Sequence, residues 1–176
     1  MAGCAAAQNP PPPGSVIYTR APDRLPVRGD FKTVMMQEHD RARAAFGSPR
    51  LVWDDALARD AMVYARTMAD RRVFQHDPNL QRLGQGENLW MGTKGHFAYR
   101  EMIGHFIGES RYFRPGTFPD VSTTGNWADV GHYTQMVWPT TTHMGCAITS
   151  NRTDDYLVCR YRAPGNIVGV RIAPTR

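Results

Sequence analysis

Apolar residues recur at helical spacing early in the chain. From Phe31 to Phe46 they return at intervals of three and four, and Gly47-Ser48-Pro49 follows as a stop signal. This pattern predicts a first helix over about residues 32–46. Arg50 to Trp53 is typical of a short extended segment. Asp54, a good N-cap residue, then predicts the start of a second helix that ends near Arg72.

The second half of the chain alternates loops with apolar segments. Residues 74–93 contain several glycines and Asp77-Pro78-Asn79, which favours loop, and a third helix is predicted over residues 96–111. Residues 117–129 look irregular. The apolar stretches 144–150 and 156–162, joined by a turn-forming segment, predict a β-hairpin. Three helices, a long loop and a hairpin indicate an α+β domain in which helices cover a mainly antiparallel sheet.

Length and composition indicate one globular domain behind an extended N-terminal segment. The 176 residues are 41% hydrophobic and 21% charged, and no apolar run approaches the roughly 20 residues of a membrane-spanning helix. Residues 1–30 are rich in proline and lack apolar periodicity, which predicts a flexible tether, and residues 31–176 form the domain. The net charge of +5 favours contact with anionic envelope surfaces. The arginines are scattered, which argues against nucleic-acid binding.

The three cysteines fall into two groups. Cys146 and Cys159 lie in the two strands of the predicted hairpin, where they could face each other and be oxidised; the alternative is a pair of buried thiols in a reduced cytosolic protein. Cys4 ends Met1-Ala2-Gly3-Cys4, which resembles the end of a bacterial lipoprotein signal but lacks its apolar region. We therefore weigh lipidation of Cys4 equally against a chance cysteine in the tether.

Histidines are the main candidates for chemistry. His76 follows the second predicted helix, Glu87 comes eleven residues later, and His132 precedes the hairpin. Imidazole nitrogen and carboxylate oxygen are ligands that Zn²⁺ accepts, although 56 positions between the two histidines do not by themselves bring them together. Glu101, His105 and Glu109 share one predicted helical face, which makes either an alternative site or, as we favour, a solvated salt-bridged stripe. His39 is expected to support packing of the first helix, and His96 and His143 are expected at the surface. Three tryptophans lie among apolar neighbours and are expected in the core, namely Trp53, Trp90 and Trp138.

Several segments resemble, in order, the motifs of the CAP superfamily, which comprises cysteine-rich secretory proteins, insect venom antigen 5 and plant pathogenesis-related proteins and is also called the SCP domain. They are Phe74-Gln75-His76, Gly86-Glu87-Asn88-Leu89, Gly131-His132-Tyr133-Thr134-Gln135-Met136-Val137-Trp138, Met144-Gly145-Cys146-Ala147 and Cys159-Arg160-Tyr161. The likeness runs from about residue 32 to 169. It implies a three-layer α/β/α sandwich with a large cleft, in a secreted, periplasmic or envelope-anchored bacterial protein.

The resemblance also implies a tetrad of two histidines and two glutamates. By motif these are His76, Glu87 and His132, with Glu109 as the fourth member from a looser match, because Phe106 and Ile107 stand where the family has Trp and a second aromatic residue. In the family the histidines bind a divalent metal, often zinc, and the glutamates reach the metal through water or steady the histidines, since a carboxylate that accepts the second imidazole N–H fixes the tautomer of the ring. The alternative is a hydrogen-bonded polar cluster that only holds the loops.

Two functions follow from the resemblance. The first is a binding module whose cleft, with or without a metal, holds a lipid, glycan or peptide. The second is a metal-dependent hydrolase in which Glu87 or Glu109 assists a metal-bound water. Two histidines are fewer than the three protein ligands customary for catalytic zinc, and no serine, threonine or cysteine occupies a recognisable nucleophile turn, which favours binding. The hydroxyl residues nearest the motifs are Ser110, Ser122 and Thr134.

Overall fold

The computed structural model describes residues 16–21 and 24–175. Its main sheet has five strands in the order β1-β3-β6-β5-β2, and a second sheet pairs β4 with β7. The strands are β1 Ile17–Tyr18, β2 Val52–Trp53, β3 Gly86–Thr93, β4 Gly116–Thr117, β5 His143–Ser150, β6 Asp154–Arg162 and β7 Arg171–Ile172. The three long strands pair antiparallel, whereas the short edge strands β1 and β2 pair parallel. The sheet is therefore mixed, although the predicted antiparallel pairing holds for its centre.

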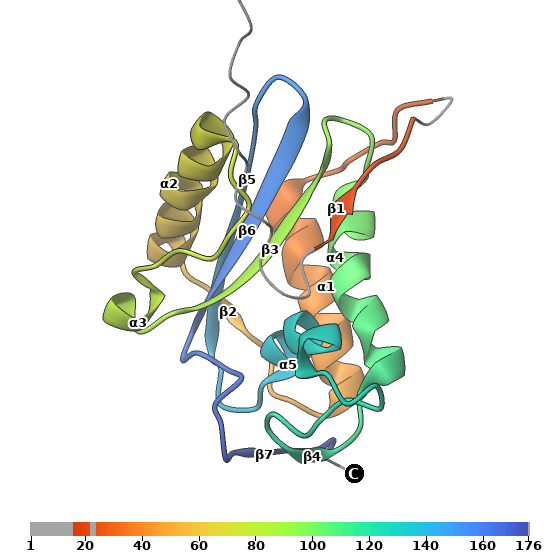
Figure 1. Ribbon diagram of the computed structural model, residues 1–176, viewed down its shortest axis with the longest axis vertical. Coiled ribbons are helices and arrows are strands. Elements are labelled where there is room, and N and C mark those ends of the chain that lie inside the picture. The colour runs from red at the N-terminus through yellow and green to blue at the C-terminus, as the bar shows by residue number, and fades with distance from the viewer. Residues whose placement is uncertain (1–15, 22–23, 176) are drawn as a thin grey trace, which may run out of the picture.

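Helices cover both faces of this sheet, which makes three layers (Figure 1). On one face lies α2, Asp55–Arg71, which packs on β5 and β6. On the other face lie α1 Phe31–Phe46, α4 Tyr99–Gly108 and α5 Gly131–Val137. Each face has its own apolar core. The predicted α/β/α sandwich is confirmed.

Local signals explain the elements that the sequence pattern predicted correctly. The Asp30 carboxylate accepts a hydrogen bond from the backbone N–H of Thr33 at the start of α1, and Asp54 accepts from two backbone N–H groups at the start of α2. Gly47 ends α1 in the left-handed conformation that glycine adopts at least cost. In the hairpin, Cys146 lies opposite Cys159 and the two form a disulfide. The oxidised alternative for these cysteines is thus confirmed.

The prediction of loop over residues 74–93 was wrong in its second half, because β3 is the strand next to the middle of the sheet. Its glycines are needed for close contacts: a Cβ on Gly86 would lie 2.1 Å from Gln135 Oε1, and one on Gly92 would lie 2.6 Å from the Trp90 ring. Only a four-residue helix, α3 Leu80–Leu83, interrupts the irregular stretch before it.

Two further segments differ from the sequence prediction. The third helix begins later than expected, at Tyr99, and continues beyond Gly108 as the 3₁₀ helix η1, Glu109–Tyr112. The block from Gly131 to Val137, which no periodic pattern marked as a helix, forms α5, preceded by the short 3₁₀ helix η2 Trp127–Asp129.

The predicted tether is partly ordered within the described residues. Ile17–Tyr18 adds β1 to the edge of the main sheet, so the extended segment through residue 30 is not wholly detached from the domain. The proline run and Cys4 lie outside the described residues, and the expectation of lipidation is untested. Among residues 16–21 and 24–175, no helix is both long and apolar enough to span a membrane.

Candidate functional site

The His132 ring is held by two contacts at the start of α5. Its Nδ1 lies 2.6 Å from Glu109 Oε1, and its ring stacks on Phe106 with 4.6 Å between ring centroids. The carboxylate of Glu109 therefore favours the tautomer with the proton on Nδ1 and leaves Nε2 with a lone pair. Only 14% of the His132 side chain is exposed, so its orientation is well restricted.

Glu109 also serves as a cap for α5 from outside that helix. Its Oε2 accepts the backbone N–H groups of His132 at 2.9 Å and Tyr133 at 3.0 Å, which are first-turn donors that have no partner within the helix. A negative charge at a helix N-terminus is also favourable electrostatically. The same carboxylate thus starts the helix and orients the imidazole that the helix carries.

His76 forms a second imidazole–carboxylate pair. Its Nδ1 lies 2.7 Å from Glu87 Oε1, which also accepts the backbone N–H of Asp77 at 3.1 Å. The Glu87 side chain is fully buried, whereas the His76 side chain is 44% exposed. As at His132, the contact favours a proton on Nδ1 and leaves Nε2 open.

The fully buried Arg160 fixes Glu87 in place. Its Nη2 donates to Asp77 Oδ2 at 2.8 Å and its Nη1 donates to Gln85 Oε1 at 2.9 Å. Its Nε lies 2.9 Å from Glu87 Oε2 as an ion pair, but the angle is too poor for a hydrogen bond. Burial raises the pKa of Asp77, yet hydrogen bonds from Asn79 and Arg160 outweigh it and hold that pKa below its usual value. Two carboxylates therefore compensate one buried guanidinium.

Strand β3 connects the two pairs. Glu87 belongs to one pair, and the next residue, Asn88, donates from Nδ2 to the backbone carbonyl of His132 at 3.0 Å. All four tetrad candidates thus lie at the same end of β3. Among the described residues, however, no three His, Cys, Asp or Glu side chains converge to enclose a metal ion.

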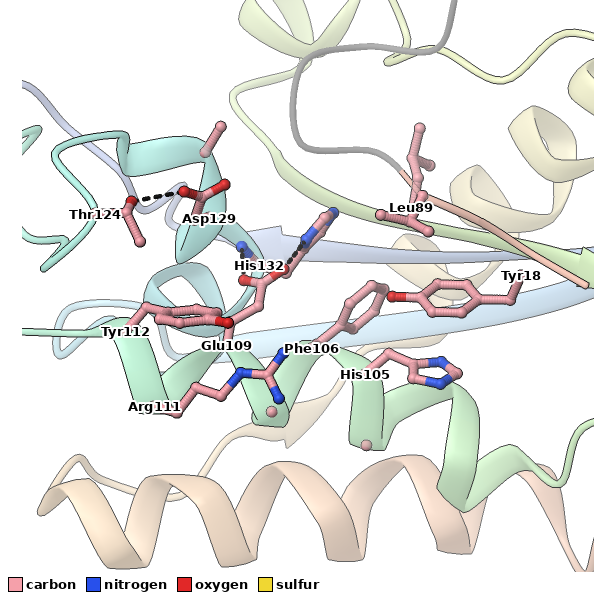
Figure 2. Close-up of a pocket in the computed structure, with 14 residues that line it drawn as sticks. Tyr18, Leu89, His105, Phe106, Glu109, Arg111, Tyr112, Thr124, Asp129 and His132 are labelled. Atoms are coloured by element: carbon pink, nitrogen blue, oxygen red, sulfur yellow. Dashed lines mark hydrogen bonds and ion pairs between the residues drawn. The ribbon is translucent and has the colours of Figure 1, made fainter.

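A cavity of about 600 Å³ opens beside His132 (Figure 2). It contains one pair, His132 and Glu109, whereas His76 and Glu87 are not in its wall. Its remaining lining comes from β1 and the residue before it, β3, α4, η1, η2 and the loop before η2: Val16, Tyr18, Leu89, Gly104, His105, Phe106, Gly108, Arg111, Tyr112, Thr124, Ala128 and Asp129. The volume is in the range of small-molecule sites.

Of the other histidines, His39 takes the packing role that the sequence suggested, whereas the predicted salt-bridged stripe of Glu101, His105 and Glu109 was wrong. His39 is fully buried, with Nδ1 at 2.8 Å from the carbonyl of Met35 and Nε2 at 2.8 Å from the Tyr161 hydroxyl, and burial lowers its pKa to about 4. Glu101 pairs with Arg20, whereas His105 Nδ1 accepts from Trp90 Nε1 at 2.9 Å. These two members of the predicted helical stripe therefore have separate partners.

Other candidates are accounted for by packing. Trp90 and Trp138 are buried as expected, while Trp53 is only partly buried. Thr134 is fully buried and its hydroxyl donates to Asn166 Oδ1 at 2.6 Å, and Ser122 is also buried. Neither hydroxyl is available as a nucleophile.

The sequence pattern missed several cavity residues and a second cavity. Tyr18, Arg111 and Asp129 carried no motif, and only the pairing of β1 with β3 and the turn of η1 bring the first two to the cavity. The second cavity, of about 520 Å³, lies on the α2 side and includes Arg71, Arg82 and the buried Arg160.

Comparison with known proteins identifies the family. Residues 36–161 match the model of the CAP family, described as the cysteine-rich secretory protein family, and the chain belongs to it. Pathogenesis-related protein 1C of Nicotiana tabacum is 32% identical over 76% of this chain and 76% of its own length. Venom allergen 5 of Polistes dominula is 31% identical over 78% of this chain and 69% of its own length.

Solved structures show the same fold. The crystal structure titled NaASP2 with Zn²⁺ has a TM-score of 0.70 and 23% identity, covering 89% of this chain and 91% of its own. A structure of BmVAL-1 has a TM-score of 0.64 and 23% identity, covering 89% and 87%.

Proposed function

We propose that this CAP domain is an extracellular binding module whose two tetrad histidines bind a divalent metal, zinc fitting best, beside a cleft for an organic ligand. One observation carries the metal proposal. In both pairs a carboxylate contacts Nδ1, so both Nε2 atoms are left as ligands of the kind that zinc accepts.

The residues present fit an open site better than a closed one. Two imidazoles supply half of a tetrahedral coordination, so water or ligand oxygen would complete it, in agreement with the lack of a third converging side chain in the described ranges. A solved relative with the same fold carries Zn²⁺ in its title. Bound zinc would supply a Lewis acid at the cleft; the protein's part is to orient the imidazoles.

The carboxylates favour binding over hydrolysis. Both oxygens of Glu109 are engaged, one by the His132 ring and one by two backbone N–H groups. Glu87 Oε1 accepts from His76 and Asp77, and Oε2, which has no hydrogen-bond partner, is fully buried in an ion pair with Arg160 and is therefore not exposed to water. A general base needs an oxygen free to take a proton from water. Neither glutamate offers one, which speaks against the alternative of a metal-dependent peptidase.

The proposed location rests on the disulfide and the family. The bond between Cys146 and Cys159 is typical of an oxidising compartment, and the family takes its name from secretory proteins. Anchoring to a bacterial envelope through Cys4, and attraction of the +5 chain to an anionic surface, complete the proposal. A lipid, glycan or peptide is the expected ligand class.

Zinc titration by calorimetry and native mass spectrometry tests the metal site. We expect about one Zn²⁺ per chain, with affinity reduced more than about tenfold in His132→Ala and in His76→Ala, because each variant removes one of two protein ligands. His143→Ala is the matched control, since the only side-chain hydrogen bond of His143 among the described residues is to Thr142 and it lies in neither imidazole–carboxylate pair. Equal zinc affinity in the wild type and both tetrad variants would refute the proposed metal site. Peptidase activity that is lost in Glu87→Gln would instead support the hydrolase hypothesis.

A further inference from the structure

One wall of the cavity presents hydrogen-bond donors that no described residue accepts. The Tyr18 hydroxyl and the Arg111 guanidinium have no hydrogen-bond or ion-pair partner among residues 16–21 and 24–175. His105 adds a third donor: because its Nδ1 accepts from Trp90, its ring proton is on Nε2. The two carboxylates in the lining, Glu109 and Asp129, already accept hydrogen bonds from protein groups, so these three donors suit a ligand with an oxyanion.

Tyr18 is held rigidly at this wall. Its backbone pairs with β3, and its ring stacks on His105 with 3.7 Å between centroids and 6° between planes. Figure 2 shows its hydroxyl directed toward Phe106, over the middle of the pocket. Burial raises the pKa of this hydroxyl and Glu109 raises it further, so it stays a protonated donor at neutral pH.

Arg111 supplies a positive charge that forms no ion pair among residues 16–21 and 24–175. It follows Glu109 by two residues in η1, and its guanidinium lies 4.7 Å from the centroid of the Tyr112 ring. The Glu109 carboxylate is already used by His132 and Tyr133. Arg111 is part of the cavity lining, and in Figure 2 its guanidinium lies below the side chains of Glu109 and Phe106. It can therefore pair with an incoming anion.

We infer that the cavity recognises a small organic carboxylate, whose oxygens accept from Arg111 and Tyr18 and whose apolar part lies on Phe106 and Leu89. A planar guanidinium matches a carboxylate in a two-pronged geometry, and the apolar side chains beside it exclude a purely polar ligand. The inference rests on the proposed function, since it assumes that the cavity is the ligand cleft. Binding of the carboxylate requires no metal, although His132 lines the same cavity.

Benzoate is a suitable probe, with benzamide as its uncharged counterpart of the same shape. In NMR titrations of metal-free protein, we expect millimolar binding of benzoate and about tenfold weaker binding of benzamide. Arg111→Gln should weaken benzoate binding about tenfold, and Tyr18→Phe should weaken it several-fold, about as expected for one lost hydrogen bond. The matched control is Arg82→Gln, which removes the same charge from an exposed arginine at the second cavity and should change nothing.

The inference is overturned if Arg111→Gln binds benzoate as tightly as the wild type, or if benzamide binds equally well. Inorganic phosphate binding as tightly as benzoate would also overturn it, because the apolar contacts would then contribute nothing. Zinc uptake, measured separately by native mass spectrometry, keeps the two proposals apart. Benzoate binding that depends on Arg111, in a protein without zinc affinity, would sustain the anion site and remove the metal site.

Discussion

Replacing Glu109 with Gln would test the double role of this carboxylate with little change in shape. The amide oxygen can still accept from the backbone N–H groups of His132 and Tyr133, as Oε2 does now. The amide nitrogen, however, is a donor and would meet the donor His132 Nδ1–H. The imidazole must then move its proton to Nε2 or turn away. We expect both α5 and the candidate metal ligand to be affected.

The cost can be worked out from the contacts. The charge-assisted contact between Glu109 and His132 is 2.6 Å long, and such a bond contributes about 1.5–3 kcal/mol. Loss of a negative charge at a helix N-terminus adds about 0.3–1 kcal/mol. Because 18% of the Glu109 side chain is exposed, solvent reduces the sum, and a loss of about 2–3 kcal/mol is expected. For a domain of this size the melting temperature should fall by roughly 4 to 12 °C.

Urea and thermal unfolding measure this loss, and long-range imidazole NMR at pH 8 reports the tautomer of His132. Glu101→Gln is the matched control on the adjoining helix, where a 40% exposed carboxylate pairs with Arg20 and should contribute at most about 1 kcal/mol. The reasoning is refuted if Glu109→Gln is no less stable than Glu101→Gln, or if His132 keeps its proton on Nδ1 in the variant.

Two further predictions concern stability. Burial lowers the pKa of His39 to about 4 in the folded protein, against about 6.5 unfolded, so its contribution to stability is complete above pH 6.5 and is lost as the pH falls toward 4. Urea unfolding should show a loss of roughly 3 kcal/mol over this range, and an equally steep pH profile in His39→Gln would contradict the prediction. The double variant Cys146→Ala/Cys159→Ala opens a link across a separation of 13 residues and should unfold about 3 kcal/mol more easily, whereas a loss below about 1 kcal/mol would show that the hairpin needs no cross-link.

Elements with local signals were predictable from the sequence. Helices α1 and α2 each combine apolar periodicity with an aspartate cap, so their bounds were predicted within a residue or two. The hairpin of β5 and β6 consists of two apolar runs separated by turn residues. In each case the residues that form the element also lie next to one another in the chain.

Strands β1 and β3 were not predictable because their stability comes from distant partners. In β3, Glu87 and Asn88 interrupt the apolar run. Both are buried because β6 supplies their partners: Arg160 forms an ion pair with Glu87, and the Tyr161 hydroxyl accepts a hydrogen bond from Asn88. In the sequence, Gly86 and Gly92 indicate a loop; the structure shows that they are needed because side chains lie too close for a Cβ atom. A two-residue strand such as β1 exists only through its pairing with β3.

The candidate site was predictable to the extent that motifs carried it. His76, Glu87 and His132 lie in specific motif blocks, and the loosely matched Glu109 also contacts an imidazole. Tyr18 and Arg111 could not have been selected, because no motif marks them and they are 93 positions apart. Their meeting depends on β1, which the composition of the N-terminal segment did not indicate.

The contacts of Glu109 link the folding of the segment from Gly131 to Trp138 to the orientation of the His132 ring. A seven-residue helix is too short to be stable alone, and the first-turn donors of α5 are bound by a carboxylate from another element. The same carboxylate orients His132, so the contacts that fold this segment also prepare the imidazole for a ligand. Losses of binding in Glu109 variants therefore include a loss of structure. His132→Ala removes the imidazole, with its contacts to Glu109 and Phe106, but leaves the acceptor for both backbone N–H groups, so a comparison of its unfolding with that of Glu109→Gln separates the cap from the imidazole contact.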